Sequence, residues 1–341
     1  MNLKNALKNA AELLDKNIDK LDIILVAHVL APRGYDNPLQ TNCSETEHFT
    51  LQEFNDIYQG IVNAGFYIRK VHFSEFEFIQ EIFQAPDKYA NTVVMNLCRN
   101  GIGMNKKVAI PAICDLLGIK YTSSGSAQCA IARNKWLYTS LLSSNGINCP
   151  ITGFKGNELS KKLHNSTMVI CKPNHESASQ GVDENSIMKL KEAIDYTSED
   201  ILIKEFIDGY ECEVPIFSSK GQCFALPPVG IRFNSKMNSQ ILSDTVSKAN
   251  DYGFFPLNQI LSDEICSKIM TDAISVFKLL GLEKYGRIDF RINKKNNMHY
   301  VIDISTTPYI TKHSSLAYAV EYAGGSYNDI YKLIIASVLS Q

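Results

Sequence analysis

Strand-like and helix-like patterns alternate along the first part of the chain. Runs rich in β-branched residues predict strands at residues 22–29 and 91–98, and GFYIRKVHF (65–73) predicts a third. Apolar residues recur at helical spacing in LQEFNDIYQGIVNAGF (51–66), and the segment 108–122 predicts a short helix followed by a short strand. An amphipathic helix is expected ahead of the first strand. Such alternation predicts an open α/β sheet.

The middle of the chain mixes helices with strands. We expect a helix, a stop and a strand over residues 132–154, and a strand over STMVICKP (166–173) that runs into a polar stretch. Residues 187–196 have a helical pattern, whereas DILIKEFIDGYECEVPIF (200–217) predicts two strands around a turn at Gly209. This part of the chain therefore predicts an α+β unit.

The last third begins with a polar stretch that has no clear period, residues 229–256, and we expect a long loop there. Ser262 is the predicted N-cap of an amphipathic helix over residues 262–281. The segments RIDFRIN and HYVIDIS then predict a hairpin, and YNDIYKLIIASVLS predicts a terminal helix.

Composition narrows the class of protein. The chain has 341 residues, 45% of them hydrophobic, which is enough for two or three subdomains. The formal net charge of -2 argues against a nucleic-acid-binding surface. Nine cysteines without a CxxC pair indicate reduced thiols. No segment reaches the ~18 apolar residues of a membrane span, so we expect a soluble cytoplasmic protein with no membrane partner.

Two aspartates give the most specific chemistry. Asp289 and Asp303 lie in the two strands of the predicted hairpin, where they come close enough to hold Mg²⁺. Arg287, two residues earlier, shares a face with Asp289 and either forms a salt bridge or stabilises phosphate charge. Lys172 ends a strand before the small-residue loop HESASQG, which suits a phosphate site, although a solvated lysine is the simpler interpretation.

Two further features are weaker. The acids of ILIKEFIDGYECEV suit a purine and ribose site, but they also suit a solvent-facing hairpin. His313 and Ser314 stand at a predicted helix start, which can bind a carboxylate, and Ser314 as a plain N-cap is the alternative.

The order of these segments resembles the ATP-grasp superfamily, and in particular the D-alanine–D-alanine ligases. The likeness runs from residue 91 to the C-terminus, includes AIPAICDLLGIKYTSSGSAQCAIARNKW, and is faint in the first ninety residues. It implies a three-subdomain ATP-grasp fold of α/β and α+β class. The expected subdomains are an N-terminal substrate domain (1–122), a central ATP-grasp subdomain (123–217) and a C-terminal one with the metal site (218–341).

The resemblance also implies roles for individual residues. ATP phosphates are expected at Lys135 and Lys172 under a loop carrying Glu176 and Ser179, with adenine at Lys204, Glu205 and Ile207 and ribose at Glu211. The catalytic residues implied are Arg287, for the tetrahedral intermediate, and Lys248, for the γ-phosphate. Asp289, Asp303 and Ser305 are expected to hold one or two Mg²⁺ ions, or Mn²⁺ in their place. The substrate residues implied are Glu45, Tyr309, His313 and Ser314.

The chain departs from the family pattern near both substrates. Asp303 and Ser305 replace a Glu and an Asn, and Tyr309 stands where the family has the Gly of a tight turn. The Ser and Tyr partners of the first-site Glu are matched here by Ala178 and Ala249. These changes predict a retuned site that does not take D-alanine as its first substrate.

The resulting expectation is a carboxylate–amine ligase that uses ATP and Mg²⁺ to join two small amino-acid-like substrates through an acylphosphate. The alternatives are a genuine D-alanine–D-alanine ligase of cell-wall synthesis, a non-catalytic ATP-binding regulatory homologue, and a kinase that stops at the acylphosphate. Family members often dimerise through the N-terminal domain, so the resemblance also allows a homodimer.

Overall fold

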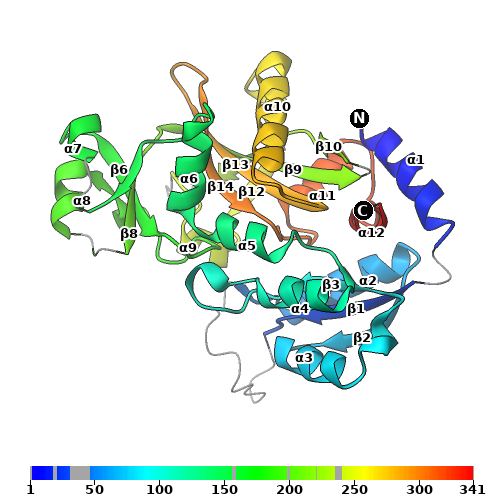
Figure 1. Cartoon of the computed structure of the whole chain (residues 1–341). Helices are drawn as coiled ribbons and strands as arrows, with labels where there is room; N and C mark the ends of the chain where they lie inside the picture. The colour runs from blue at the N-terminus through cyan, green and yellow to red at the C-terminus, as the bar shows by residue number, and fades with distance from the viewer. Residues whose placement is uncertain are drawn as a thin grey trace.

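The strands of the chain form three sheets, shown in the computed structural model in Figure 1. The structure describes residues 2–17, 21–30, 47–155, 159–196, 198, 200–219, 221–234 and 240–340. Within these residues, no helix is long and apolar enough to cross a membrane. The cysteines among them are all free thiols. The expected mixture of α/β and α+β architecture is confirmed.

The first sheet is parallel, with the strand order β2-β1-β3-β4. Its strands are β1 (Asp22–Ala27), β2 (Tyr67–His72), β3 (Thr92–Leu97) and β4 (Lys120–Tyr121). The helices around it are α2 (Leu51–Asn63), α3 (Glu75–Gln84), η3 (Pro86–Tyr89), η4 (Gly103–Asn105) and α4 (Ala109–Leu117). Every residue of β3 is buried, as expected of a central parallel strand covered on both faces. The alternation predicted for this region is confirmed.

The second sheet is antiparallel, with the order β5-β8-β6-β7. Its strands are β5 (Thr152–Phe154), β6 (Met168–Pro173), β7 (Ile187–Lys189) and β8 (Ile201–Glu205). The accompanying helices are α5 (Ser126–Arg133), α6 (Lys135–Ser144), α7 (Leu159–Lys162), η5 (Glu184–Ser186) and α8 (Leu190–Tyr196). The helix predicted over 187–196 is wrong in its first three residues, because they pair with β6 as strand β7.

The third sheet has the order β12-β11-β9-β13-β14, with β10 added to β9. Its strands are β9 (Gly209–Ser219), β10 (Gln222–Ala225), β11 (Val229–Phe233), β12 (Tyr252–Pro256), β13 (Tyr285–Asn293) and β14 (His299–Ser305). Its helices are α9 (Asp244–Lys248), η6 (Leu257–Gln259), α10 (Asp263–Leu279), α11 (Ser315–Tyr322) and α12 (Asp329–Leu339). The predicted hairpin of β13 and β14 is confirmed.

Two expectations for this region need correction. The long loop predicted over 229–256 is wrong, because β11 and β12 pair there as antiparallel strands with α9 between them. Phe254 and Phe255 of β12 pair with Ile231 and Gly230, and that apolar cross-strand contact outweighs the polar average of the segment. Strand β9 also crosses the boundary expected at residue 217 and pairs with β13 along its length.

The two ends of the described chain lie together. Helix α1 (Leu3–Leu14) buries one face, because Leu3, Ala6, Ala10 and Leu14 recur every three or four residues. Helix α12 lies beside α1 (Figure 1), and these residues share a hydrophobic core with Ile334 and other residues of α12. The same core includes Phe217 of β9 and Ile23 of β1. The parallel sheet is thereby fixed against the third sheet.

Candidate active site

Three acidic residues lie side by side across neighbouring strands of the third sheet. Glu213 of β9 pairs in register with Asp289 of β13, and Asp289 pairs with Asp303 of β14. We call these residues the carboxylate row. Glu213 and Asp289 are buried and Asp303 is half-buried, and all three line one cavity. Hard oxygen donors gathered in this way suit a divalent cation.

The guanidinium of Arg287 joins two members of this row. Its Nε and Nη2 donate to the two carboxylate oxygens of Asp289 at 2.7 and 2.8 Å. Its Nη1 lies 3.0 Å from Glu213 Oε2. Burial opposes its charge, but the two carboxylates raise the pKa of Arg287 above its ordinary value. A permanent positive charge therefore stands at the centre of the row.

The pKa values of the two aspartates are shifted in opposite directions. Burial raises the pKa of Asp289, and the neighbouring Glu213 adds to the effect while Arg287 opposes it. Burial also acts on Asp303, but Lys135 and Lys172 outweigh it and lower the pKa of that carboxyl. The row thus has an electropositive end at Asp303 and a crowded acidic end at Glu213.

Two buried lysines, Lys135 and Lys204, and the half-buried Lys172 surround the electropositive end. Lys204 and Lys172 point to the carbonyl oxygen of Ile302, at 3.2 and 3.5 Å. Lys135, the first residue of α6, donates to the carbonyl oxygens of Asn174 and Glu176. Burial lowers the pKa of both Lys135 and Lys204 to about 7. An anion that binds beside such a lysine favours its protonated, charged form.

The loop after β6 covers these lysines. Ala178 and Ser179 adopt positive φ angles of 51° and 60°, a conformation that non-glycine residues avoid unless the surroundings impose it. Ser179 Oγ donates to the carbonyl oxygen of Leu242 at 2.6 Å, and Glu176 forms an ion pair with Lys106. Glu176 and Ser179 thus lie in one loop beside the cavity, which both of them line.

The residues expected around adenine and ribose also line the cavity. Glu205 accepts a hydrogen bond from the backbone N–H of Ile151 at 3.4 Å, and Ile207 follows it in the link between β8 and β9. Glu211 is held by Arg291 at 2.5 Å. Burial raises the pKa of Glu211, although Arg291 opposes this effect. Lys204 was expected beside the adenine with Glu205 and Ile207. Its ammonium group instead points to the carbonyl oxygen of Ile302, as that of Lys172 does.

The segment after β14 lies on the other side of the cavity. Ser305 is the cross-strand partner of Arg287, and Tyr309, His313 and Ser314 line the same space. The His313 ring lies between aromatic neighbours, 5.1 Å from the ring of Tyr252, and burial lowers its pKa. Ser314 is the N-cap of α11 and accepts from the backbone N–H of Ala317. Ser314 is thus both the N-cap of α11 and a residue of the cavity lining.

One expected residue is not brought to the cavity, and the structure does not describe a second. Lys248 lies on an exposed face of α9, where its ammonium group is 2.7 Å from Asp244 of the same helix. Glu45 lies outside the described residues. The structure instead places Glu47 beside the site, with no exposed surface and with Ser177 donating to it at 2.5 Å.

Glu47 changes our picture of the first substrate pocket. We expected the first-site acid to have lost its serine partner, with Ala178 in its place, but Glu47 has such a partner one residue earlier, at Ser177. Burial opposes ionisation, yet Arg133, the Ser177 hydrogen bond and Lys106 lower the pKa of Glu47 to about 2. The sequence CSETEH offers two glutamates two residues apart, and nothing in its pattern chooses between them.

Sequence reasoning also missed several residues that shape the cavity. Arg99, Lys107 and Arg133 line it, and Lys106 lies behind them. Glu213, which had been noted only among the acids of its strand, completes the carboxylate row. The cavity has a volume of about 220 Å³ and is lined from all three sheets and their loops.

The sequence is similar to that of known ligases. A family model described as "D-ala D-ala ligase C-terminus" matches residues 155–336. A D-alanine–D-alanine ligase of Polynucleobacter asymbioticus is 26% identical over 246 residues, covering 68% of this chain and 70% of that protein. One from a Wolbachia of Drosophila simulans is 28% identical over 245 residues, covering 67% of this chain and 72% of that protein.

Solved structures show the same fold over nearly the whole chain. The D-alanine–D-alanine ligase of Bacillus anthracis complexed with ATP has a TM-score of 0.66 and 18% identity, covering 93% of this chain and 97% of that one. The VanG D-Ala:D-Ser ligase of Enterococcus faecalis has a TM-score of 0.65 and 16% identity, covering 94% and 100%. The chain therefore belongs to the D-alanine–D-alanine ligase family of ATP-grasp enzymes, which are ATP-dependent peptide-bond-forming ligases.

Proposed function

We propose that the protein joins two amino-acid-like substrates, that its acyl donor is not D-alanine, and that the chemistry takes place at the carboxylate row. The observation that carries this proposal is the juxtaposition of Glu213, Asp289 and Asp303 with Arg287 in one lined cavity. A phosphoryl-transfer site needs cations for the phosphates and carboxylates for a metal ion, and both are present side by side.

The residues fit ATP and a divalent cation. The ammonium groups of Lys135 and Lys172 lie beside Asp303, where they suit phosphate oxygens, and the link after Glu205 suits a purine edge. Asp289 and Asp303, with Glu213 beside them, supply the carboxylates for Mg²⁺. When bound, that ion neutralises charge on the phosphate oxygens. Asp303 is one methylene shorter than the family's Glu, so Glu213 offers a compensating oxygen donor.

Arg287 has the geometry to stabilise the developing oxyanion. The donor carboxylate takes the γ-phosphoryl group of ATP and becomes an acylphosphate, which the amine of the acceptor then attacks. A guanidinium has five N–H donors, and Arg287 uses three of them on Asp289 and Glu213. No other hydrogen bond of this guanidinium is seen within the described residues, so its remaining donors can bind the tetrahedral oxygen, after which phosphate leaves with the bonding electrons.

The acceptor side supports a substrate unlike D-alanine. Tyr309 packs edge-on against Phe49, with 5.6 Å between ring centroids, and lies under the guanidinium of Arg99. A ring in this place fills space that a glycine would leave open. His313 and Ser314 lie near it and offer a place for the acceptor carboxylate.

The relatives named D-alanine–D-alanine ligase favour the second candidate, a genuine enzyme of that kind. The test is phosphate release from ATP and Mg²⁺ over paired L- and D-amino acids, with mass detection of products. We expect a condensed product in which the residue that contributed its carboxylate is not D-alanine. D-alanyl-D-alanine as the sole product would contradict the proposal, and ATP binding without any product would favour a non-catalytic homologue.

A further inference from the structure

Four cationic side chains gather where the parallel sheet meets the cavity. Arg99 and two consecutive lysines, Lys106 and Lys107, come from the segment after β3. Arg133 is the last residue of α5. Each is at most 7% exposed. We call these four residues the cation cluster. Buried cations repel one another and lose their hydration, so such a group needs anions to compensate it.

The acids around the cluster are too few. Among the described residues, two carboxylates form ion pairs with it. Glu47 lies 3.5 Å from Lys106 and 3.6 Å from Arg133, and Glu176 pairs with Lys106. Asp303 also attracts Arg133, but it already serves the lysines of the phosphate end. Within the part of the chain that the structure describes, the cluster therefore carries a surplus of positive charge.

Several N–H donors of the cluster lack a hydrogen bond within the described residues. Arg99 Nε and Arg133 Nε are buried and have no hydrogen-bond partner there, and Arg133 Nη2 has only its ion-pair contact with Glu47, at 3.6 Å. Both arginines also line the cavity. Lys107 shares the same space, and burial lowers its pKa strongly, with Arg99 and Arg133 adding to the effect. Buried guanidinium nitrogens without hydrogen bonds, in residues that line a cavity, are features of an anion site.

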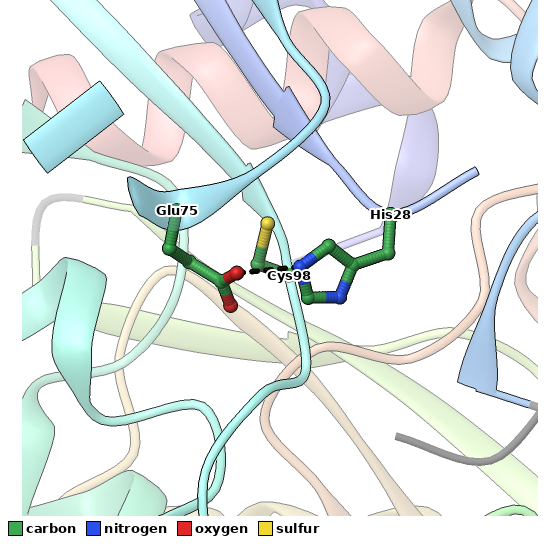
Figure 2. A group of neighbouring side chains, drawn as sticks. All are labelled: His28, Glu75 and Cys98. Carbon is green, nitrogen blue, oxygen red and sulfur yellow. Dashed lines mark hydrogen bonds and ion pairs between the residues drawn. The ribbon is translucent and has the colours of Figure 1, made fainter. Parts of the chain in front are cut away.

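The backbone that carries Arg99 is held in place from behind. Glu75, at the start of α3, accepts from the backbone N–H of Asn100 at 3.3 Å and from His28 at 2.5 Å. Figure 2 shows the side chains of His28 and Glu75 meeting beside Cys98. Asn100 in turn accepts from the backbone N–H of Lys107, which adopts a positive φ of 68°. Such a strained conformation persists where the surroundings impose it. Here the hydrogen bond to Asn100 keeps Lys107 near Arg99.

The cation cluster lies on the side of the cavity where the first substrate is expected. Its partner Glu47 belongs to the segment in which the first-site acid was expected, and the acceptor residues His313 and Ser314 belong to the segment after β14. Arg99 links the two sides, because its guanidinium carbon lies 4.1 Å from the ring centroid of Tyr309. An anion bound at Arg99 and Arg133 would therefore lie between Glu47 and the reacting centre.

We propose that the acyl donor carries a second carboxylate besides the one that reacts, and that Arg99, Lys107 and Arg133 bind it. The inference rests on the proposed function, because it names the class of the first substrate at that site. Two guanidinium groups suit a planar carboxylate, and the negative charge of that bound carboxylate offsets surplus positive charge of the cluster. Glu47 is already paired with Lys106 and Arg133, so a substrate ammonium group contributes less here than the second acid.

The test compares acids with their amides, which match them in size. Aspartate against asparagine and glutamate against glutamine, in both chiral forms, are assayed for phosphate release with a mixture of acceptors. Their binding is measured by calorimetry with a non-hydrolysable ATP analogue present. We expect the preferred acid to bind at least about tenfold more tightly than its amide. Phosphoserine serves as a separate arm, and its preference over every dicarboxylate would overturn the choice of a carboxylate.

Variants locate the effect. Arg99→Gln and Lys107→Met should reduce the preference for acid over amide by about tenfold and leave the affinity for the ATP analogue unchanged. Lys295→Met, an exposed change in the turn between β13 and β14, is the control and should alter neither. Equal loss of ATP analogue affinity and donor affinity would show that the cluster binds the nucleotide, and this would overturn the inference.

The outcomes separate the two proposals. Acidic donors that bind tightly but never yield a product would leave the donor site standing and remove the proposed ligase activity. Products formed as well from amides or from monocarboxylic amino acids would keep the ligase and remove the donor site. Binding of neither acids nor amides would also overturn this inference.

Discussion

The carboxylate row and the cation cluster lie on the same cavity but are built in different ways. The row sits on three paired strands, so its geometry follows from strand register, with Asp289 between Glu213 and Asp303. The cluster is assembled from two separate stretches, around Arg99 and Arg133, and closes on Glu47. Arg287 pairs with Asp289 and Glu213 of the row, and Lys135 and Lys172 lie near Asp303, whereas the described partners of the cluster leave it with surplus positive charge. In our proposals, the row serves the ligase chemistry and the cluster serves the choice of substrate.

The largest effect is expected at the centre of the row. Arg287→Lys keeps the charge but loses the fork that binds Asp289 and Glu213, so we expect turnover to fall at least about a hundredfold. Asp289→Asn should have an effect of similar size. Steady-state phosphate release measures both, and thermal unfolding checks that the fold is retained. Turnover near the wild-type rate in either variant would remove these residues from the chemistry.

A smaller effect should separate two glutamates of one strand. Glu213→Gln takes a charge from the row, so we expect the Mg²⁺ concentration for half-maximal rate to rise about tenfold. Glu211→Gln, two residues away on the same face of β9, is the matched control because it contacts Arg291 and not Arg287. It should raise the KM for ATP and leave the Mg²⁺ requirement unchanged. The same response in both variants would contradict the role given to Glu213.

The affinity for ATP should depend on pH through the buried lysines. The pKa of Lys135 is about 7 in the free protein, below its ordinary value, so this lysine is neutral above that pH. Bound phosphate favours the charged form, so ATP affinity should fall by up to about tenfold per pH unit above 7 and binding should take up protons.

Calorimetry at pH 7.5 in two buffers with different ionisation heats measures this proton uptake. Lys135→Arg is the control, since an arginine remains charged over this range and should remove part of the uptake. Proton release on binding, or affinity that rises above pH 7, would contradict the assignment of Lys135 to phosphate.

The smallest effect is expected where the two regions touch. Tyr309→Gly removes the ring under Arg99 and should change the preference among acceptors by about threefold to tenfold. Tyr309→Phe keeps the ring and loses only the hydroxyl, so it separates packing from hydrogen bonding. Competition between acceptors, read by mass, measures the change. An unchanged preference in the glycine variant would place Tyr309 outside the acceptor pocket.

The sequence predicted the row better than the cluster for physical reasons. Hairpin pairing is local, so the spacing of Asp289 and Asp303 was enough to bring them together. Arg99, Lys106, Lys107 and Arg133 lie in loops and at a helix end, where no period indicates which way a side chain points. Their meeting with Glu47 depends on packing between distant segments, which periodicity does not report.

The fold shows the same contrast. The parallel strands are continuous apolar runs and were predicted well, because burial on both faces selects such residues. Strands β11 and β12 were missed, since each needs its partner to hide its apolar face and the segment between them is polar. Strand β7 was taken for the start of a helix, because three residues before α8 are too few to show a period of two.

The central claim is that a donor carboxylate is activated by ATP before the amine attacks it. The direct measurement uses a donor labelled with ¹⁸O in its reacting carboxylate, together with ATP, Mg²⁺ and the acceptor. If an acylphosphate forms, one labelled oxygen passes to the phosphate released with each product, and the mass of that phosphate rises accordingly. Phosphate that carries oxygen from water alone, with the label retained in the donor, would show simple ATP hydrolysis and contradict the account.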